Sequence, residues 1–122
     1  MTRAVRGHRR KKKITARERL GIPRELWVVL TPRDRYLRAK YGLTERQYDA
    51  MVVDQDGACH ICGWLPKPGR RHHVDHDHRT KRVRGVLCFR CNHRLLGCGL
   101  EDAKLHAAAA RYLERVYDGR RL

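Results

Sequence analysis

The sequence of 122 residues contains no long hydrophobic run and few acidic residues. No uninterrupted apolar stretch approaches the roughly 20 residues needed to cross a bilayer. The basic amino terminus is not followed by the apolar core of a signal peptide. Cysteine is present in an odd number, five, which argues against a fully paired disulfide framework. We therefore expect an intracellular chain whose thiols stay reduced and can bind metals.

The scarcity of acids leaves a large positive charge. The chain has 29 Lys and Arg against 13 Asp and Glu, a formal net charge of +16. Such a chain pairs naturally with a polyanion, because phosphates that are neutralised by Lys and Arg release their condensed counterions. An anionic membrane surface is the alternative, but it calls for a basic amphipathic helix with bulky apolar residues opposite, and we find none. Composition thus predicts a nucleic-acid partner and no membrane partner.

Hydrophobic residues make up only 41% of the chain, and its length suits one small domain. Burial alone then leaves a thin margin of stability, which small domains often supplement with a structural metal. The first 13 residues carry seven Lys and Arg and no acid, a composition typical of a disordered arm that binds phosphates. The expected segments are this basic arm (1–13), a helical segment (14–56), a metal-bound core (57–97) and a C-terminal helix (98–122).

Capping signals predict three short helices in the segment 14–56. In the third, Tyr48, Met51 and Val52 recur at helical spacing and predict a side packed in the core. Residues 26–30, "LWVVL", are too short to assign, so a strand and a buried helical turn both stay open. The helix starts are Thr15 with Glu18, Thr31 with Pro32, and Thr44 with Gln47, and the stops are Gly21, Gly42 and Gly57.

The chain changes character between Gly57 and Gly97, where cysteines, histidines and glycines are concentrated. Residues 72–78 and 83–88 read as two short strands joined by the turn "RTKR". A brief helix is expected from Arg90 towards Gly97. The core is therefore predicted to be a hairpin followed by a helix.

The tail predicts a helix over residues 100–118, with Glu101 and Asp102 in its first turn and Gly119 as its stop. One stripe of this helix is apolar, which indicates a face packed in the core. A dimer seam is the alternative, so a monomer and a homodimer both stay open. The stripe consists of Leu105, Ala109, Tyr112 and Val116.

Two C-x-x-C pairs, Cys59 with Cys62 and Cys88 with Cys91, have the spacing of metal knuckles. A tight turn can bring both thiolates of a pair to one metal, and two pairs complete a closed tetrahedral shell, the mark of a structural zinc site. The 25 residues between the pairs exceed the usual zinc-ribbon spacing of roughly 15 to 20. We therefore expect the metal to close a functional loop or hairpin.

The alternative shell mixes His60 or His72 with three of the cysteines, although both C-x-x-C pairs are intact. Cys98 is left over, and a small buried apolar residue is the expected role for it.

Residues 72–78, "HHVDHDH", interleave four histidines with two aspartates, and Asn92 directly follows the last zinc cysteine. Phosphodiester hydrolysis needs a base that titrates near neutral pH, as histidine does. It also needs a hard divalent cation with oxygen ligands such as Asp and Asn, and a basic surface that holds the polyanion. The residues expected to contact phosphates are Arg70, Arg71, Lys81, Arg82, Arg84, Arg90 and Arg94, with Arg9, Arg10, Lys11, Lys12 and Lys13 in the arm. Such contacts position a protein without specifying bases, so no sequence preference can be inferred.

Four stretches together resemble the phage recombination endonuclease VII family, a branch of the HNH, or ββα-metal, nucleases. They are "GLTERQYDAMVVDQDGACHICG", "VDHDH", "VRGVLCFRCN" and "LLG", and they span roughly residues 41–97. The resemblance implies an α+β fold: a small treble-clef-like ββα-metal module, pinned by a four-cysteine zinc and flanked by helices. It also implies a phage protein that acts on DNA in the cytoplasm of the bacterial host.

The family's site residues carry over to positions of this chain. The resemblance implies that Asp75 and Asn92 hold a catalytic Mg²⁺ or another divalent cation. It implies that His76 is the general base, and that His78 contacts the scissile phosphate or the metal shell. The expected reaction is an in-line cut that leaves 5′-phosphate and 3′-hydroxyl ends. In a regular strand, however, Asp75 and His76 point to opposite faces. They can serve one phosphate if the strand twists, bulges or ends there, or if base and metal approach the phosphorus from opposite sides.

Two departures from the family pattern bear on the substrate. Resolvases of the family place an acid three residues after the metal-binding asparagine, where this chain has Leu95. They also continue into a long C-terminal region that builds a dimer for junction cleavage. We therefore expect a nicking or double-strand endonuclease, with a four-way junction, a branch, a nick and plain duplex all open as substrates. The alternative is a non-catalytic zinc module that binds nucleic acid, which leaves Asp75, His76 and Asn92 unexplained.

Overall fold

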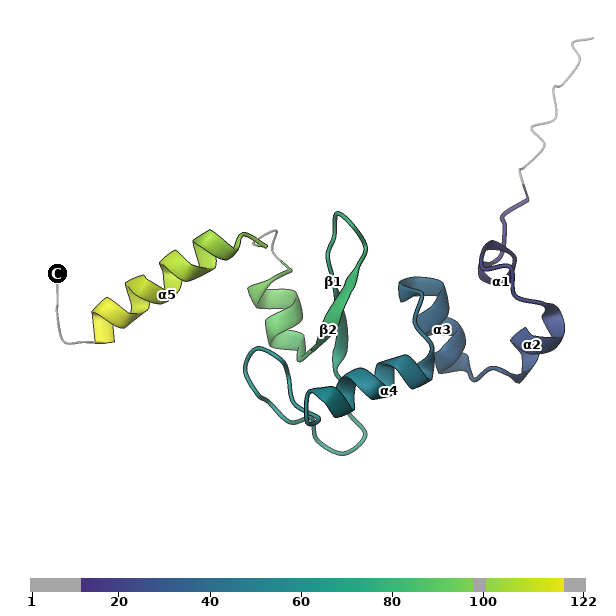
Figure 1. The fold of residues 1–122 in the computed structure, drawn as a ribbon, viewed down its shortest axis with the longest axis horizontal. Helices are drawn as coiled ribbons and strands as arrows, with labels where there is room; N and C mark the ends of the chain where they lie inside the picture. The colour runs from purple at the N-terminus through teal and green to yellow at the C-terminus, as the bar shows by residue number, and fades with distance from the viewer. Residues whose placement is uncertain (1–11, 98–100, 118–122) are drawn as a thin grey trace, which may run out of the picture. The chain divides into compact units, whose positions relative to one another are not determined.

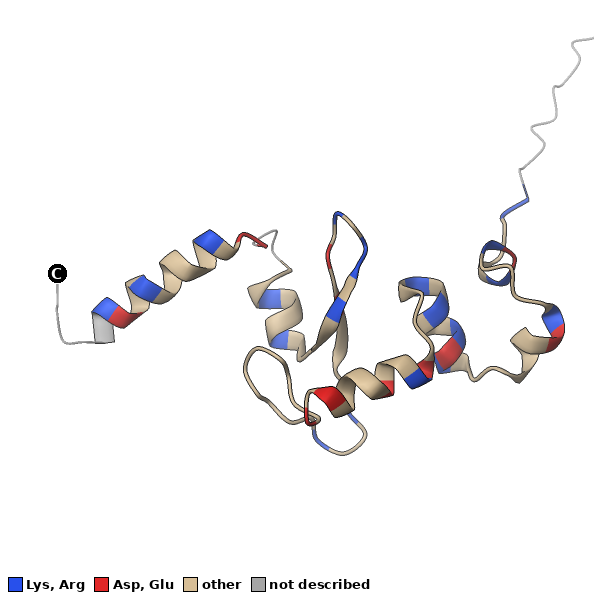
Figure 2. Ribbon diagram, viewed as in Figure 1, with Lys and Arg blue, Asp and Glu red and all other residues tan. Residues whose placement is uncertain are grey.

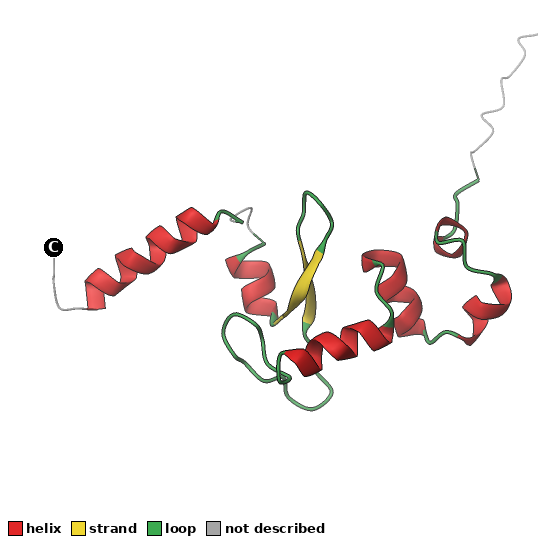
Figure 3. Ribbon diagram, viewed as in Figure 1, coloured by secondary structure: helices red, strands yellow, loops and turns green. Residues whose placement is uncertain are grey.

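The computed structural model describes residues 12–97 and 101–117, so most of the expected basic arm and Cys98 lie outside the described residues. In chain order, the described residues form α-helices, then a β-hairpin and a π-helical turn, and then a last α-helix (Figure 1, Figure 3). Its contacts divide it into two compact units, residues 1–47 and 48–122. The expected α+β fold class is confirmed.

The first unit contains α1 (Ala16–Arg19), α2 (Arg24–Val29) and α3 (Pro32–Tyr41). The predicted caps of α1 and α3 are confirmed. Thr15 and Glu18 form the reciprocal capping box of α1. Thr31 caps α3 ahead of Pro32, because its hydroxyl accepts a hydrogen bond from the third residue of the helix. Gly42 ends α3 with φ = 69°, a left-handed conformation that glycine adopts without a Cβ penalty.

The stretch that the sequence left open, residues 26–30, is mostly helical and lies in α2. Its apolar side chains are not buried, since Leu26, Val28 and Val29 are exposed. The guanidinium of Arg35 donates hydrogen bonds to the carbonyls of Trp27 and Val28, at 2.8 and 3.0 Å. These bonds satisfy carbonyls that the end of a short helix leaves without intrahelical donors. The C-terminal end of α2 is thus capped by a side chain of α3.

The helix α4 (Glu45–Asp54) begins as predicted, with Thr44 and Gln47 hydrogen-bonded to each other at 2.8 and 3.0 Å. It ends three residues before Gly57, the predicted stop, because residues 55–57 form a turn. Tyr48 is buried, and its hydroxyl donates a 2.7 Å hydrogen bond to the carbonyl of His72. This hydrogen bond fixes the backbone of His72, the residue directly before the hairpin, to α4.

The predicted hairpin consists of β1 (His73–His76) and β2 (Val83–Leu87), which pair antiparallel. The register shifts between Asp75, which faces Gly85, and His76, which faces Val83. Arg84 is thus the extra residue of a β-bulge, a feature that bends a strand and re-aims its side chains. An irregularity of the strand was one of the two ways in which Asp75 and His76 could serve one site, and the structure has its bulge on the opposite strand, β2.

The side chain of Gln55, just after α4, completes the outer edge of β2. Its amide nitrogen donates to the Val86 carbonyl at 2.8 Å, and its oxygen accepts from the Val86 N–H at 3.0 Å. This pair of bonds imitates one rung of a β-ladder, and Val86 is fully buried. A Cβ at Gly85 would lie 2.8 Å from the Gln55 oxygen, so the close approach requires glycine there.

The expected helix after the second knuckle is η1 (Arg90–Leu95), a π-helical turn in which the Leu96 N–H donates to the Cys91 carbonyl at 3.1 Å. Cys59, Leu87, Cys88 and Cys91 form a buried cluster at its base, against which Leu96 packs. The small core of the second unit is therefore built around sulfur atoms.

The tail helix α5 (Ala103–Tyr117) begins later than predicted. Glu101 and Asp102 precede it, and Asp102 caps it by accepting from the N–H groups of Lys104 and Leu105, at 2.9 and 3.3 Å. The prediction of a packed face is wrong for the described side chains, because Leu105 and Tyr112 are exposed, as is Ala109. None of the described helices has the length and hydrophobicity needed to span a membrane.

Candidate functional site

The four cysteines of the two C-x-x-C pairs lie close enough to hold one zinc ion. Their sulfur atoms are all within 4.8 Å of one another, and Cys62 Sγ lies 3.7 Å from Cys88 Sγ. A tetrahedron with Zn–S bonds of about 2.3 Å places its sulfurs roughly 3.8 Å apart, so the arrangement fits zinc. The cluster predicted from the spacing is confirmed. Within the described residues, no other group of three or more His, Cys, Asp or Glu side chains is close enough to share an ion.

The backbone around the first knuckle favours the thiolate form that zinc requires. Burial opposes ionisation of Cys59, but N–H groups of the two knuckles, that of Cys62 foremost, outweigh burial and lower the pKa of this thiol to about 6. At Cys91, in contrast, burial raises the pKa. One thiol of the cluster thus ionises more easily than a free cysteine and another less easily. A bound metal cation would stabilise the thiolate form of all four cysteines.

The alternative shell with a histidine ligand is not the arrangement that the structure forms. His60 is exposed. His72 is buried, and its Nε2 lies 2.8 Å from the carbonyl oxygen of Gly57. His73 packs edge-on against His93, which stacks on Phe89. Three of these histidines, His72, His73 and His93, are thus engaged with other groups of the protein.

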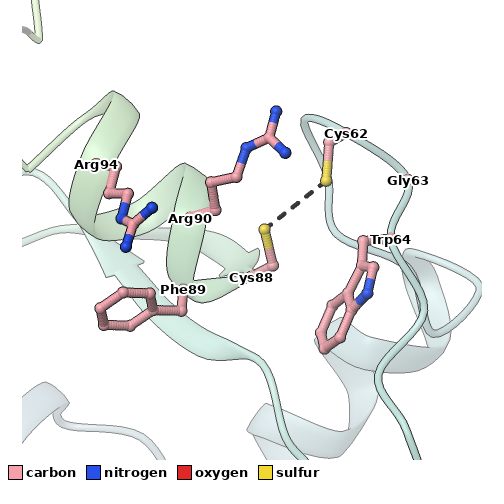
Figure 4. A pocket seen from close by; sticks show the side chains of 7 residues that line it. All are labelled: Cys62, Gly63, Trp64, Cys88, Phe89, Arg90 and Arg94. Atoms are coloured by element: carbon pink, nitrogen blue, oxygen red, sulfur yellow. Dashed lines mark hydrogen bonds between the residues drawn. The ribbon is translucent and has the colours of Figure 1, made fainter.

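A pocket of about 640 Å³ opens beside the cysteine cluster (Figure 4). The figure shows Cys62 and Cys88 with their sulfurs turned toward each other, and Trp64 and Phe89 on either side of Cys88. Arg90 and Arg94, both exposed, reach into this region from η1. Because a zinc ion with four thiolates carries a net charge of −2, these two guanidinium groups also offset charge at the cluster.

The carboxylate of Asp75 is buried, with 7% of the residue exposed, and it is held by Arg84. The guanidinium makes two parallel hydrogen bonds, Nε to Oδ2 at 2.8 Å and Nη2 to Oδ1 at 2.9 Å. Arg84 also reaches Glu101, with Nη2 3.2 Å from Oε1. The hydrogen bonds that Arg84 donates, to Asp75 foremost and also to Glu101, raise the pKa of Arg84 although burial lowers it. Arg84 is therefore a firmly charged partner of Asp75, and its expected contact with a phosphate stays a prediction.

His76 is half-buried and stacks on His78, with ring centroids 4.9 Å apart and planes 23° apart. Burial lowers the pKa of His76 below its ordinary value of 6.5, and neighbouring cations, His78 foremost, lower it further against the opposing charge of Asp75. The imidazole is consequently neutral near neutral pH and able to accept a proton. His78 is more exposed, and its Nε2 lies 3.8 Å from Glu101 Oε1.

The second aspartate of the pattern, Asp77, belongs to the turn between the strands. Its Oδ1 accepts hydrogen bonds from the N–H groups of Arg79 and Thr80, at 2.8 and 2.9 Å. These two bonds lower the pKa of its carboxyl group. Asp77 therefore fixes the hairpin turn in the manner of an Asx-turn.

Asn92 lies on η1, half-buried, and its backbone N–H donates to the carbonyl of Cys88 at 2.9 Å. Within the described residues its side chain forms no hydrogen bond with Asp75. The two expected magnesium ligands thus lie on β1 and η1, and no hydrogen bond joins their side chains in the described residues. Leu95, at the position where family resolvases have an acid, is exposed.

Lys and Arg follow the hairpin, η1 and the loop before β1 (Figure 2). The side chains expected to contact phosphates are exposed in the described part of the chain, and that of Arg84 is also paired with Asp75 and Glu101. Arg9, Arg10 and Lys11 lie outside the described residues. Besides Arg84, the exposed set consists of Lys12, Lys13, Arg70, Arg71, Lys81, Arg82, Arg90 and Arg94.

Comparison with known proteins decides the family. The sequence model of the family described as recombination endonuclease VII matches residues 34–115, more than half of the chain. The chain belongs to the recombination endonuclease VII family. The "Gene 59 protein" of Mycobacterium phage D29 and that of Mycobacterium phage L5 are both 39% identical to it, over 77 and 75 residues. No solved structure matches the chain.

The two phage relatives are longer than the matched region. The matches cover 63% and 62% of this chain, but 47% and 46% of the relatives. This member of the endonuclease VII family therefore spans about half the length of the curated relatives it matches.

Sequence reasoning missed two residues that contact the hairpin, Gln55 and Glu101. Gln55 was overlooked, because a side chain that pairs with a strand edge leaves no local pattern. Glu101 was assigned to the first turn of a helix, whereas its carboxylate contacts Arg84 and lies near His78. Only the proximity of Glu101 to the hairpin in the fold reveals this contact.

Proposed function

We propose that this chain is a zinc-stabilised, Mg²⁺-dependent DNA endonuclease of the HNH type that hydrolyses phosphodiester bonds inside the bacterial host cell. One observation carries the proposal. A buried carboxylate, Asp75, directly precedes a neutral imidazole, His76, at a bulge in a hairpin that the four-cysteine cluster closes. Membership of the recombination endonuclease VII family supports the same activity.

In the proposed reaction His76 is the general base. A base must be unprotonated before it can take a proton from water, and the lowered pKa of His76 meets this condition at neutral pH. The stacked ring of His78 is the neighbouring group that contacts the phosphate. The bulge at Arg84 lies on β2, opposite the step from Asp75 to His76, so the base and the cation would approach the phosphorus from opposite sides, as in-line attack allows.

Asp75 and Asn92 would hold the divalent cation. Their carboxylate and amide oxygens are the donors that Mg²⁺ prefers, and the buried carboxylate of Asp75 already has a cationic partner in Arg84. When bound, such a cation stabilises the negative charge that develops on the phosphate and on the leaving oxygen. The products would then carry 5′-phosphate and 3′-hydroxyl ends.

The exposed Lys and Arg side chains of the hairpin, η1 and the preceding loop would hold the DNA backbone. This contact carries no base preference, so the proposal covers nicking and double-strand cleavage of duplex or branched DNA. Leu95 in place of an acid favours these activities over junction resolution.

The test is cleavage of supercoiled plasmid by zinc-loaded protein with Mg²⁺, compared with His76→Ala. We expect the variant to keep DNA binding, measured by fluorescence anisotropy, and to lose cleavage by a factor of about 10² or more. The matched control is His60→Ala, which removes an exposed imidazole outside the proposed site and should cut like the wild type.

Two outcomes would contradict the proposal. Plasmid that stays supercoiled with wild-type protein across several divalent metals would favour a zinc module that only binds nucleic acid. Loss of binding and cleavage together in His76→Ala would make His76 a structural residue. Parallel assays on linear, nicked and four-way substrates, with the mass of the protein measured in solution, would identify the substrate and the oligomeric state.

A further inference from the structure

One guanidinium group, that of Arg84, is shared by carboxylates from two distant segments of the chain. It holds both oxygens of Asp75 on β1 through Nε and Nη2, at 2.8 and 2.9 Å. Its Nη2 and Nη1 also lie 3.2 and 3.4 Å from the two oxygens of Glu101, just before α5. Arg84 therefore links a buried acid of the proposed active site to an acid for which that function has no use.

The two ion pairs differ in their surroundings. The Asp75 side chain is 10% exposed and the Glu101 side chain 26%. Within the described residues, Arg84 is the only side chain that hydrogen-bonds to Asp75. Leaving a buried carboxylate without a cation is strongly destabilising, so Asp75 needs a cationic partner at all times. In this structure that partner is Arg84.

A divalent cation on Asp75 competes with Arg84. Both carboxylate oxygens already accept hydrogen bonds from the guanidinium, and a cation bound there would face a positive charge at hydrogen-bond distance. Arg84 must therefore withdraw when the cation binds. Glu101 offers it a second carboxylate that is already in contact, so Arg84 can withdraw without losing its partner.

We propose that Glu101 is a positioning residue of the nuclease site, which retains Arg84 when Arg84 releases Asp75 to the divalent cation. This inference rests on the proposed function, because it takes Asp75 as a ligand of that cation. Glu101 acts through Arg84 and does not bind the cation. Its carboxylate also lies 3.8 Å from His78 Nε2, so the same side chain borders the proposed phosphate contact.

The test measures cation binding and not cleavage. Zinc-loaded protein is titrated with Mn²⁺, and free Mn²⁺ is followed by electron paramagnetic resonance. Glu101→Gln should weaken Mn²⁺ binding by about fivefold, the scale of one partly exposed ion pair, because Arg84 then holds Asp75 alone. Asp102→Asn is the matched control: it removes the same charge one residue away, keeps a side chain that can cap α5, and should bind Mn²⁺ like the wild type.

A second series separates positioning from direct ligation. Arg84→Lys keeps a positive charge but cannot form the two parallel hydrogen bonds to Asp75, so Mn²⁺ should bind more tightly than in the wild type. In this background, adding Glu101→Gln should change Mn²⁺ affinity by less than twofold, because residues that act through one partner are not additive. Circular dichroism and zinc content check that each variant is folded.

Each result decides the proposal. If Glu101→Gln and Asp102→Asn weakened Mn²⁺ binding equally, the effect of Glu101 would be one of general charge, and the proposal would be overturned. An undiminished effect of Glu101→Gln in the Arg84→Lys background would make Glu101 a ligand of the cation and also overturn it. Failure of the proposed function looks different: neither the wild type nor any variant would then bind Mn²⁺ or cut plasmid.

Discussion

Asp75 and His76 are neighbours in sequence but lie in different electrostatic environments. Asp75 is buried and held by two hydrogen bonds from the cationic guanidinium of Arg84. His76 is half-buried and surrounded mainly by positive charge, which favours its neutral form. The pair thus presents an anion and a neutral base side by side, as a metal-assisted hydrolase requires.

The pKa of His76 is testable without cleavage. After burial and His78, the charge of Lys81 is the next cause that lowers this pKa. The ring protons of His76, followed by NMR in zinc-loaded protein without Mg²⁺, should titrate below 6.5. In Lys81→Gln the midpoint should move upward, because protonation of His76 no longer meets that repulsion. A midpoint that stays unchanged in Lys81→Gln would show that Lys81 does not act on His76.

At the scale of elements, the two-stranded hairpin has little sheet of its own to stabilise it. Three supports replace further strands: the hydroxyl of Tyr48, the side-chain amide of Gln55 and the four-cysteine cluster. The contact of Gln55 with the backbone of Val86 also explains Gly85, since a methyl group there would collide with it. The hairpin is therefore held from both edges.

Replacing Gln55 with Ala should destabilise the protein by about 2 kcal/mol, because the N–H of the fully buried Val86 loses its partner and its C=O keeps only the 3.4 Å hydrogen bond from the His60 N–H. Urea unfolding followed by circular dichroism measures this free energy. Val53→Ala, a truncation of a side chain that is 73% exposed on α4, is the control and should stay within about 0.5 kcal/mol of the wild type. If the two variants lost equal stability, the bonds of Gln55 to β2 would contribute nothing.

At the scale of the whole molecule, few side chains are fully buried: Leu37 and Val86 are the largest among the described residues. The first unit relies on helix caps and on side chains that bind backbone carbonyls. The second unit is organised around four cysteines instead of an apolar core. A metal at that cluster would supply folding free energy that the apolar residues do not provide.

Cys88→Ser should abolish zinc binding and unfold residues 57–97, because metal binding and folding are one equilibrium in such small sites. A chelator should have the same effect on the wild type. Zinc content and circular dichroism are the measurements. Cys98→Ser makes the same change outside the two C-x-x-C pairs and should leave both unchanged. A Cys88→Ser protein with an unaltered spectrum and zinc content would refute the zinc assignment.

The sequence by itself determined the local structure of this protein. Caps and stops such as Thr31 and Gly42 fix helix ends through bonds within a few residues, and the C-x-x-C pairs fix two knuckles in the same way. The family could also be identified from linear motifs, as the match over residues 34–115 confirms.

Only the tertiary structure decided which partners those local pieces meet. Arg84 was expected on a phosphate but binds Asp75 and Glu101, and the stripe on α5 was expected in a core but is exposed. Such contacts join residues 9, 17 and 31 positions apart, as for Arg84 with Asp75, Arg84 with Glu101, and Gln55 with Val86. A hydrogen bond between distant positions forms only when the tertiary fold brings the two segments together. No short stretch of sequence specifies that fold.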